Sequence, residues 1–282
     1  MSGEDIRQLS RVRWTATAAG WGRRADQFRA ATMPVATWMV DALGPQPGDT
    51  LLELAAGPGD TGFLAAELIR PGGELICSDF VPEMLNIAQQ RAKALGLDNV
   101  RFKQIDAETG IDIEAASIDG VLCRWGYMLM ADPVTALGQT RRVLKPGARL
   151  ALAAWSGPDE NPWSALPARE LIRRGLEEPP DPDAPGQFAW APEGVIAERL
   201  EEAGFVDYEI AAVDFTIAYA SAEDWWATTS DMSMRFADAT RAMDAAARAE
   251  IMAALAEAAA PYTDGDGAIA IPARTWTAVA TA

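Results

Sequence analysis

The stretch with the clearest potential for chemistry lies between residues 50 and 63, where an apolar run that holds one acid leads into a glycine turn. Leucines surround Glu53, which predicts a buried strand of a parallel sheet. Gly57 and Gly59 come next, and without a Cβ their backbone can turn sharply and approach a ligand closely. Asp60 stands where a helix would begin, with the free N–H groups of that helix directed at the turn. Strand, turn and helix start together predict a nucleotide-type pocket at the carboxyl end of a strand.

The glycine spacing also satisfies a dinucleotide-binding fingerprint. Gly57, Gly59 and Gly62 form G-x-G-x-x-G, and Asp79 follows about 20 residues later, so an NAD(P)-dependent oxidoreductase is one interpretation. Two features argue against it: the motif starts near residue 50, behind a polar leader that contains tryptophan, and the predicted strand holds the acid Glu53. Such an enzyme should also carry an active-site pair such as Tyr-x-x-x-Lys. That motif is absent from this chain, whose three lysines are Lys93, Lys103 and Lys145.

A second acid ends the next predicted strand. Asp79 follows the strand expected at 74–78, beside the glycine turn. A carboxylate in that place can accept both hydrogen bonds of a ribose diol. The alternative is that Asp79 caps the helix expected at 82–95, because Asp is a favoured capping residue.

Two more polar residues end the third and fourth predicted strands. Asp106 follows the strand expected at 100–104, as a ligand or as a plain turn acid. Arg124 follows the strand expected at 118–123, and a buried arginine there needs an anionic partner. The candidate partners are a cofactor carboxylate, the substrate, Glu53 and Asp60.

In order along the chain, these segments resemble the class I S-adenosylmethionine-dependent methyltransferases, especially the ubiquinone/menaquinone-biosynthesis C-methyltransferases. L-L-E-L-A-A-G-P-G-D resembles the first motif of that family, with Ala55 in place of its first glycine. C-S-D-F with V-P-E-M-L resembles the second strand end and its helix. The later motifs are similar to residues 104–108, 118–126 and 142–150. Each match is weak by itself, but five in the right order are specific, and the resemblance covers nearly the whole chain.

The resemblance implies S-adenosylmethionine as the cofactor. It places Asp79 on the ribose hydroxyls, the Asp106 carboxylate on the adenine amino group and the Ala107 backbone nearby. Phe80 and Met84 would pack on the adenine, or else only on the sheet. The full set of expected cofactor residues is Glu53, Ala55, Gly57, Gly59, Asp60, Asp79, Phe80, Met84, Asp106, Ala107, Arg124 and Trp125.

The acceptor side of the pocket is expected in the N-terminal segment and in lids. Residues 4–43 have the periodicity of one or two amphipathic helices, with Pro34 starting the second. In similar methyltransferases this segment caps the pocket, so Trp14 and Trp21 either line it or pack on the sheet. Ten tryptophans against four tyrosines indicate a flat-walled apolar pocket. Its other candidates, at strand ends or in lids, are Tyr127, Met128, Trp155, Trp163, Trp190, Trp225 and Trp226. An aromatic, quinone-like, polyketide or terpenoid acceptor suits such a wall.

The composition limits the classes of partner that the chain is expected to bind. With 282 residues, 49% of them apolar and 23% charged, it suits a soluble globular protein with a sizeable core. A net charge of −17 disfavours nucleic acid and anionic membranes as partners. No apolar run approaches the roughly 18 to 20 residues of a membrane span. The first residues lack the pattern of a signal peptide, so we expect a cytoplasmic protein. The oligomeric state, monomer or homodimer, stays open.

The absence of histidine removes several kinds of site. It excludes His-ligated metal centres and any triad built on histidine, so no metal is expected. Cys77 and Cys123 both fall in predicted buried strands. In the strand order of the family these strands flank the first one, roughly 9 to 10 Å apart, which is too far for a disulfide. Both cysteines are therefore expected to be inert core thiols.

Methyl transfer from a sulfonium demands orientation more than a reactive side chain. Holding the acceptor in line can lower the barrier by about 7 to 11 kcal/mol. Without histidine, any base would be a carboxylate with a raised pKa or Tyr127. The sequence singles out no catalytic residue, and it leaves open whether O, N or C is methylated. A non-catalytic protein that binds S-adenosylmethionine is a third interpretation.

The predicted fold is a single α/β domain with a Rossmann-like, mostly parallel seven-stranded sheet. The last strand should be antiparallel, with helices on both faces and helical lid insertions. The expected segments are an N-terminal cap at 1–45, a cofactor-binding core at 46–155, a lid at 156–204, a sheet strand at 205–220, a helical lid at 221–264 and a final strand at 265–282.

Overall fold

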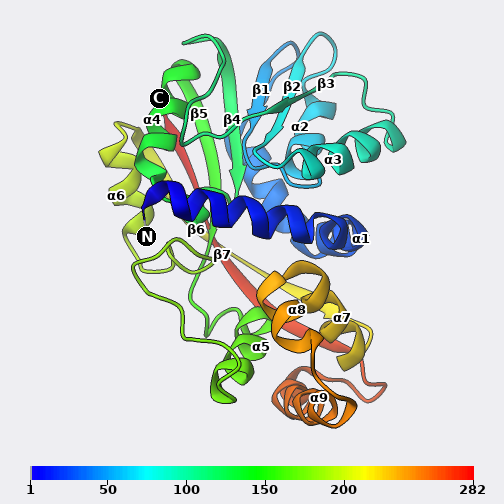
Figure 1. The fold of residues 1–282 in the computed structure, drawn as a ribbon. Coiled ribbons are helices and arrows are strands. Elements are labelled where there is room, and N and C mark those ends of the chain that lie inside the picture. Colours follow the sequence, from blue (N-terminus) through cyan, green and yellow to red (C-terminus); the bar gives the residue numbers. More distant parts are fainter. Residues whose placement is uncertain (1) are drawn as a thin grey trace.

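The computed structural model describes residues 2–282, and its framework is one seven-stranded sheet (Figure 1). The strand order is β3-β2-β1-β4-β5-β7-β6. The first five of these strands in space are parallel, and β7 runs antiparallel to both β5 and β6. The predicted mostly parallel sheet with an antiparallel last strand is confirmed. The strands are β1 (Thr50–Glu53), β2 (Glu74–Asp79), β3 (Val100–Gln104), β4 (Ile118–Arg124), β5 (Leu144–Trp155), β6 (Val206–Tyr219) and β7 (Ile269–Thr281).

The core of the sheet follows from short apolar strands joined by helical crossovers. Leu51, Leu52 and Ile76 are fully buried, as expected for strands covered on both faces. Because the strands are parallel, their carboxyl ends meet at one edge of the sheet, where a ligand site is expected. Cys77 and Cys123 remain free and buried, as predicted. The helices of this part are α2 (Thr61–Leu68), α3 (Pro82–Ala94) and α4 (Pro133–Val143), with the 3-10 turn η1 (Tyr127–Leu129) before α4.

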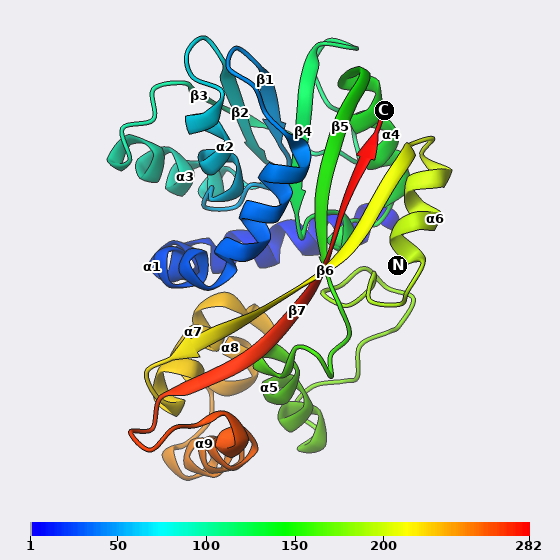
Figure 2. The ribbon, with the colours of Figure 1, turned by 180° about the vertical axis from the view of Figure 1, so that it is seen from behind.

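Two long strands connect this core to a second group of helices. β6 and β7 run beyond the other strands, and their far halves carry the helices below the sheet in Figure 2. These are α5 (Pro162–Arg173), α7 (Ala222–Met232), α8 (Met234–Arg241) and α9 (Ala245–Ala259), followed by the 3-10 turn η2 (Ala260–Tyr262). The short helix α6 (Val195–Glu202) packs on β6 at the other end. We call α5, α7, α8 and α9 the lower helices.

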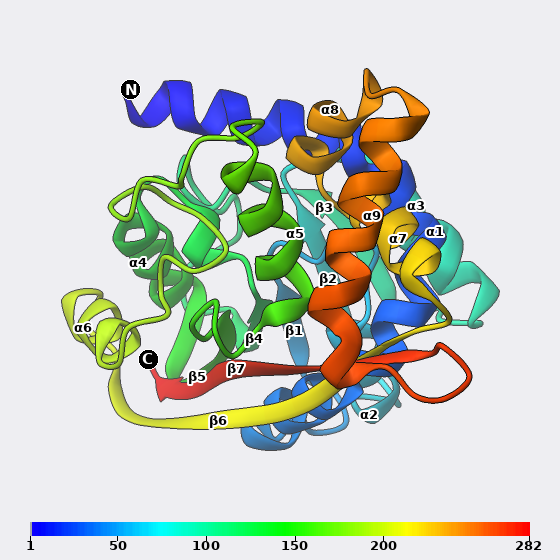
Figure 3. The ribbon, with the colours of Figure 1, turned by 90° about the horizontal axis from the view of Figure 1, so that it is seen from below.

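The N-terminal segment is one helix, α1 (Gly3–Leu43), lying between the core and the lower helices (Figure 1). The prediction that Pro34 starts a second helix is wrong, because Pro34 lies inside α1. Proline removes one backbone hydrogen bond there and promotes bending, and the ribbon changes direction along its length (Figure 3). The helix continues because Val35 and Met39 are fully buried against the core, which offsets the lost hydrogen bond.

The Ala-rich segment after α7 does not form a single helix. It forms α8 and α9 instead, separated by a break at residues 242–244. Asp244 caps α9 by accepting the Ala247 N–H at 2.8 Å, and Ser233 caps α8 through the Phe236 N–H at 3.3 Å. Side-chain caps of this kind supply partners for otherwise free N–H groups, so two short helices replace one.

The contact between α1 and α7 yields a test. A Cβ at Gly20 would overlap the backbone carbonyl of Asp231, whereas a Cβ at Gly138 in α4 would meet nothing within 4 Å. We expect Gly20→Ala to lower the free energy of unfolding by about 1 to 3 kcal/mol through overpacking. Gly138→Ala should raise it by about 0.5 to 1 kcal/mol, because Ala is the better helix former. Urea denaturation followed by circular dichroism measures both, and equal stabilities for the two variants would contradict the close packing of α1 on α7.

Candidate active site

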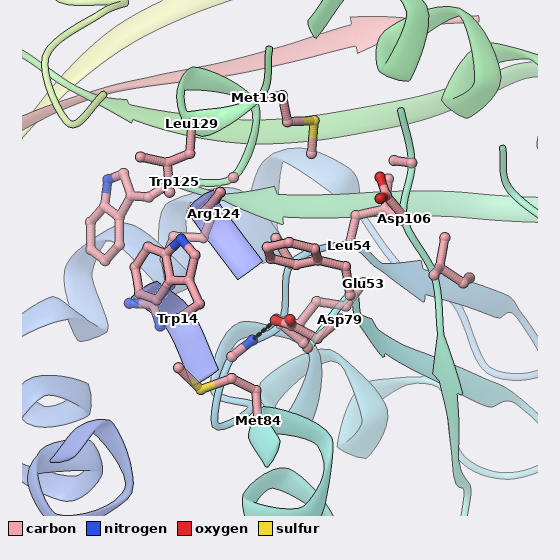
Figure 4. A pocket seen from close by; sticks show the side chains of 18 of the residues that line it. Trp14, Glu53, Leu54, Asp79, Met84, Asp106, Arg124, Trp125, Leu129 and Met130 are labelled. Atoms are coloured by element: carbon pink, nitrogen blue, oxygen red, sulfur yellow. Dashed lines mark hydrogen bonds between the residues drawn. The ribbon is translucent and has the colours of Figure 1, made fainter. Parts of the chain in front are cut away.

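A cavity opens at the carboxyl ends of β1, β2 and β4 and just beyond β3, with α1 over it. Its empty space amounts to about 1050 Å³, a figure that includes open solvent at its mouth. Figure 4 shows the side chains of Glu53, Asp79, Asp106 and Arg124 around it, each from a different strand end. The parallel sheet therefore gathers the polar residues that follow its strands.

Glu53 ends β1 and is 3% exposed. Its Oε1 accepts the backbone N–H of Gly62 at 2.9 Å, while its Oε2 is buried without a partner. Burial raises the pKa of this carboxyl to about 7, although the Gly62 N–H and the nearby Arg124 charge oppose the shift. Gly62 is required for this approach, because a Cβ there would overlap Glu53 Oε2. The unpartnered oxygen is an acceptor available to a ligand.

The glycine turn after β1 has an unusual backbone. Gly57 and Gly59 have positive φ angles of 55° and 71°, and Ala55 adopts φ 51° despite its Cβ. The left-handed conformation explains why a glycine is usual at the position of Ala55. A Cβ at Gly57 would meet nothing within 4 Å, so the space beside the turn is open, whereas a Cβ at Gly59 would overlap the ring of Phe63. Gly57 therefore leaves room for a ligand, and Gly59 allows the next helix to pack closely.

Asp79 ends β2 and fastens this turn. Its Oδ2 accepts the Gly57 N–H at 2.8 Å, and its Oδ1 accepts the Val81 N–H at 2.9 Å. Burial raises the pKa of Asp79 to about 6, and the hydrogen bonds from Val81 and Gly57 oppose that shift. Val81 is the N-cap residue of α3, so Asp79 supports the start of that helix without being its cap. Each carboxylate oxygen keeps a lone pair for a further donor.

Asp106 and Glu108 line the cavity just after β3. Asp106 Oδ1 accepts the Glu108 N–H at 3.2 Å, and its Oδ2 lies 3.5 Å from Arg11 Nη2 of α1. Arg11 also lies over the Phe80 ring, with its Cζ 5.3 Å from the ring centroid. Glu108 Oε1 accepts the Asp132 N–H at 2.7 Å, and burial raises the pKa of Glu108. These contacts join α1 to the β3 side of the cavity.

Arg124 ends β4 and has its predicted anionic partner. Its Nη2 lies 3.1 Å from Asp60 Oδ2, and its Nη1 donates to Thr32 Oγ1 of α1 at 2.6 Å. Burial lowers the pKa of Arg124, and the charges of Asp60 and Glu53 oppose that shift. Its guanidinium covers the ring of Trp125 at 4.5 Å from the centroid. Arg124 thus connects the glycine turn, α1 and the cavity wall.

Most of the residues expected to hold the cofactor come together here. Gly59 and Asp60 do not line the cavity, and Asp60 is instead occupied by two arginines, Arg91 and Arg124. The expected residues that line it are Glu53, Ala55, Gly57, Asp79, Phe80, Met84, Asp106, Ala107, Arg124 and Trp125.

Most of the residues expected on the acceptor side do not line the cavity. Trp14 and Trp21 line the cavity. Tyr127 is buried, its hydroxyl 2.8 Å from Thr140 Oγ1, and burial raises its pKa well above 10. Those that do not line the cavity are Tyr127, Met128, Trp155, Trp163, Trp190, Trp225 and Trp226.

These tryptophans form supports behind the wall. Trp155 stacks on Trp125 with 4.2 Å between ring centroids, and Trp163 lies 5.1 Å from Trp155. Trp225 donates its indole N–H to the Trp163 carbonyl at 2.9 Å. Trp190 stacks on Tyr127 at 6.1 Å. Aromatic rings bury large areas against each other, so they complete the core between the sheet and the lower helices.

Several lining residues escaped the sequence reasoning. Arg7 and Ser10 of α1 line the cavity, as does Phe28. A signal was present, because Arg7, Trp14, Trp21 and Phe28 recur every seven residues, a spacing that keeps side chains on nearly one side of a helix. Leu129 and Met130, just after β4, also line the cavity, and no local pattern distinguishes them from core residues.

Two observations test whether S-adenosylmethionine suits this cavity. The buried Glu53 Oε2 lacks a partner, and the space beside Gly57 is open. The first suits a cationic or donor group, and the second suits close approach of a ligand to the backbone. The residues present therefore fit this cofactor.

The fold and the site define a class, the Rossmann-like proteins that bind a nucleotide-type ligand at the carboxyl ends of parallel strands. Residues 45–177, slightly less than half of the chain, match the family model described as a methyltransferase domain. The predicted resemblance is thus confirmed over the cofactor side of the molecule.

The most similar relatives compared carry related names. A demethylmenaquinone methyltransferase of Thermus thermophilus is 39% identical over 108 residues, 38% of this chain and 48% of the relative. Another of Deinococcus radiodurans is 34% identical over 158 residues, 56% of this chain and 58% of the relative. The chain thus spans about half the length of the curated relatives it matches. Among solved structures, the YcgJ protein of Bacillus subtilis has the same fold, with a TM-score of 0.58 at 19% identity over 87% of this chain and 97% of that chain.

Residues 2–282 lack two further features. No helix in that range is both long and apolar enough to cross a bilayer. Nor does that range hold a group of three or more His, Cys, Asp or Glu side chains able to hold a metal ion.

The buried charge of Glu53 yields a second test. Its pKa is raised from 4.5 to about 7, so the folded protein binds more protons than the unfolded chain between these values, and stability falls as pH rises through them. A shift of this size corresponds to roughly 3 kcal/mol. Glu53→Gln lacks this decline, so the variant should gain stability relative to wild type between pH 5 and pH 8. Urea denaturation at both pH values measures the gain.

Glu74→Gln is the matched control, because Glu74 lies at the start of β2 and its side chain is 45% exposed. It should show no comparable gain. A stability difference between Glu53→Gln and wild type that is the same at pH 5 and pH 8 would contradict the raised pKa.

Proposed function

We propose that the protein transfers a methyl group from S-adenosylmethionine to a small, flat, apolar acceptor. The observation that carries this proposal is the set of three acids, Glu53, Asp79 and Asp106, at the ends of three adjacent strands around an open glycine turn. The methyltransferase domain at residues 45–177 supports the same conclusion.

Each acid has a distinct role in this proposal. Glu53 Oε2, which has no partner in the protein, would accept from the ammonium group of the cofactor. Asp79 would use its remaining lone pairs for the ribose hydroxyls while it holds Gly57. Asp106 would accept from the adenine amino group, with Met84 as an apolar wall. Bound in this way, S-adenosylmethionine supplies a methyl group already activated by its sulfonium.

The acceptor class follows from the apolar side of the cavity. Trp14 and Trp21 have ring centroids 5.7 Å apart, and Trp21 and Phe28 5.3 Å apart, which makes a continuous aromatic wall on α1. Trp125 also lines the cavity, with Trp155 stacked on its ring and the Arg124 guanidinium against the ring as well. A flat ring system suits this wall, and the relatives named as demethylmenaquinone methyltransferases make a quinone-like acceptor the first class to try.

The protein contributes orientation and exclusion of water to the reaction. Correct placement can supply about 7 to 11 kcal/mol of barrier reduction. Tyr127 does not line the cavity, so it is poorly placed to act as a base. Among the lining carboxylates, Glu108 has a pKa raised by burial, although an acidic phenol or a stabilised carbanion would need no protein base.

The two alternative functions make different demands. A nicotinamide-dependent oxidoreductase needs an acid or base beside its substrate, yet no lysine or tyrosine lines the cavity among the described residues. A non-catalytic protein needs only to bind the cofactor, and the geometry of the cofactor side accommodates that as well. Binding and turnover are therefore tested separately.

The first test is isothermal titration of the wild type with S-adenosylhomocysteine and with NADH. We expect micromolar binding of S-adenosylhomocysteine and none of NADH. Asp79→Asn should weaken the binding by roughly 10-fold or more, because a hydrogen bond to a charged group is worth about 1.5 to 3 kcal/mol. Turnover is then tested with aromatic hydroxy compounds and quinols by mass spectrometry.

Asp119→Asn is the matched control. Asp119 in β4 also accepts a backbone N–H, from Thr50 at 2.9 Å, but it does not line the cavity. The affinity of the Asp119→Asn variant for S-adenosylhomocysteine should equal that of the wild type. Binding of NADH alone would refute the methyltransferase proposal, and cofactor binding with no turnover on any acceptor would favour the non-catalytic alternative.

The raised pKa values predict the pH dependence of binding. Glu53 titrates at about 7 and Asp79 at about 6 in the free protein. A ligand that donates to their ionised forms lowers both pKa values, so its affinity rises from pH 6 to pH 8 and protons are released on binding. Titration in phosphate and in Tris, whose ionisation heats differ, measures the released protons. Glu53→Gln should lose the part of the dependence near pH 7, and affinity independent of pH would show that these carboxylates do not contact the ligand.

A further inference from the structure

Arg91 of α3 contacts the glycine turn without lining the cavity. Its Nη1 lies within hydrogen-bond distance of the carbonyl oxygens of Pro58 and Gly59, at 2.8 and 2.6 Å, and of Asp60 Oδ1 at 2.8 Å. Three acceptors from consecutive residues therefore converge on one nitrogen. The Arg91 side chain is 16% exposed, so these contacts are largely shielded from water, where charge-assisted hydrogen bonds are strong.

The turn is held from two directions. Arg91 binds its carbonyl groups, and Asp79 binds the N–H of Gly57 at 2.8 Å. β1 ends at Glu53, and the backbone hydrogen bonds nearest the turn are Ala56 N–H to Ser78 O at 2.9 Å and Gly59 N–H to Ala56 O at 3.0 Å. The contacts from Asp79 and Arg91 add to these bonds in a turn that has positive φ angles at Gly57 and Gly59.

Arg91 also belongs to a buried charge network. Asp60, 4% exposed at its side chain, lies between Arg91 and Arg124. Arg124 lines the cavity and donates to Thr32 of α1. The second α1 contact, from Arg91 Nη2 to Asp26 at 3.1 Å, involves a carboxylate that is 96% exposed, and exposed ion pairs contribute little. The contacts of Arg91 that matter most are therefore those with the turn and with Asp60.

We propose that Arg91 is a positioning residue for the cofactor site. It sets the position of the turn at residues 57–60, and through Asp60 it fixes the Arg124 guanidinium at the cavity wall. A neutral side chain at position 91 would leave two carbonyl groups without their donor and Asp60 with a single cationic partner. The assignment rests on the proposed function, since the turn is taken to hold S-adenosylmethionine.

The binding test uses Arg91→Gln and Arg91→Lys, titrated with S-adenosylhomocysteine. We expect Arg91→Gln to lose roughly 10- to 100-fold in affinity, the range found when a residue that supports the ligands of a metal site is replaced. Arg91→Lys keeps a charge and donors but not the planar fork, so it should lose less. Two controls should stay within a few-fold of wild type: Asp26→Asn, which removes only the exposed contact, and Arg70→Gln.

Arg70→Gln is the matched structural control. Arg70 likewise binds a turn, through the Gly96 carbonyl at 3.3 Å and Asp98 at 2.6 Å, but it does not line the cavity. Its loss should lower stability without lowering affinity. A folded Arg91→Gln that binds like wild type would overturn the proposal, as would equal losses of affinity in Arg91→Gln and Arg70→Gln. If Arg91→Gln does not fold, Arg91→Lys decides, and wild-type affinity in that variant overturns the proposal.

A second readout needs no cofactor. Hydrogen exchange of the ligand-free proteins should be faster at residues 55–62 in Arg91→Gln than in wild type, with no such change in Arg70→Gln. Unchanged exchange there would refute the positioning of the turn by Arg91. If the wild type fails to bind S-adenosylhomocysteine, the proposed function fails, while the exchange comparison still tests what Arg91 does to the turn.

Discussion

The structure depends on acidic side chains that are buried where parallel strands end. Glu53 and Asp79 are 3% and 5% exposed, and burial raises the pKa of both. A buried carboxylate is costly unless donors surround it, and the protein supplies them from the backbone N–H groups of Gly62, Gly57 and Val81. One oxygen, Glu53 Oε2, is left without a donor. An acceptor without a donor is expected in a site whose ligand brings the missing donor.

The glycine turn couples this site to the rest of the molecule. Asp79 holds its N–H side and Arg91 its carbonyl side, while Asp60 joins Arg91 to Arg124. Because Arg124 in turn bonds Thr32 of α1, the helix over the cavity is fastened to the same network as the turn beneath it. A change of position in α1 is therefore expected to reach the cofactor side through Arg124, a buried and charged contact, more than through the exposed Asp26.

The tryptophans have two functions that composition alone cannot separate. Trp14 and Trp21 on α1 face the cavity with Phe28, and their spacing of seven residues keeps them on one side of the helix. Behind the wall, Trp163 contacts both Trp155 and Trp225, and these contacts join β5 to the lower helices. The aromatic wall of the cavity thus contains fewer tryptophans than the composition suggested. Its shape depends on the side chains that pack behind it.

The sequence by itself indicated where the strands lie along the chain and where the site is located. Glu53, Asp79 and Arg124 end strands rich in apolar residues, and Asp106 follows the more polar third strand. Because the carboxyl ends of parallel strands share one edge, local pattern and topology suffice to bring the four together. Only the tertiary structure decided that Pro34 lies inside one helix, that Tyr127 faces Thr140, and that Asp60 is occupied by Arg91 and Arg124, which are 31 and 64 residues away in the chain. The physical reason is that periodicity shows which face of an element is buried, whereas the partner of a buried side chain comes from another segment and is set by packing.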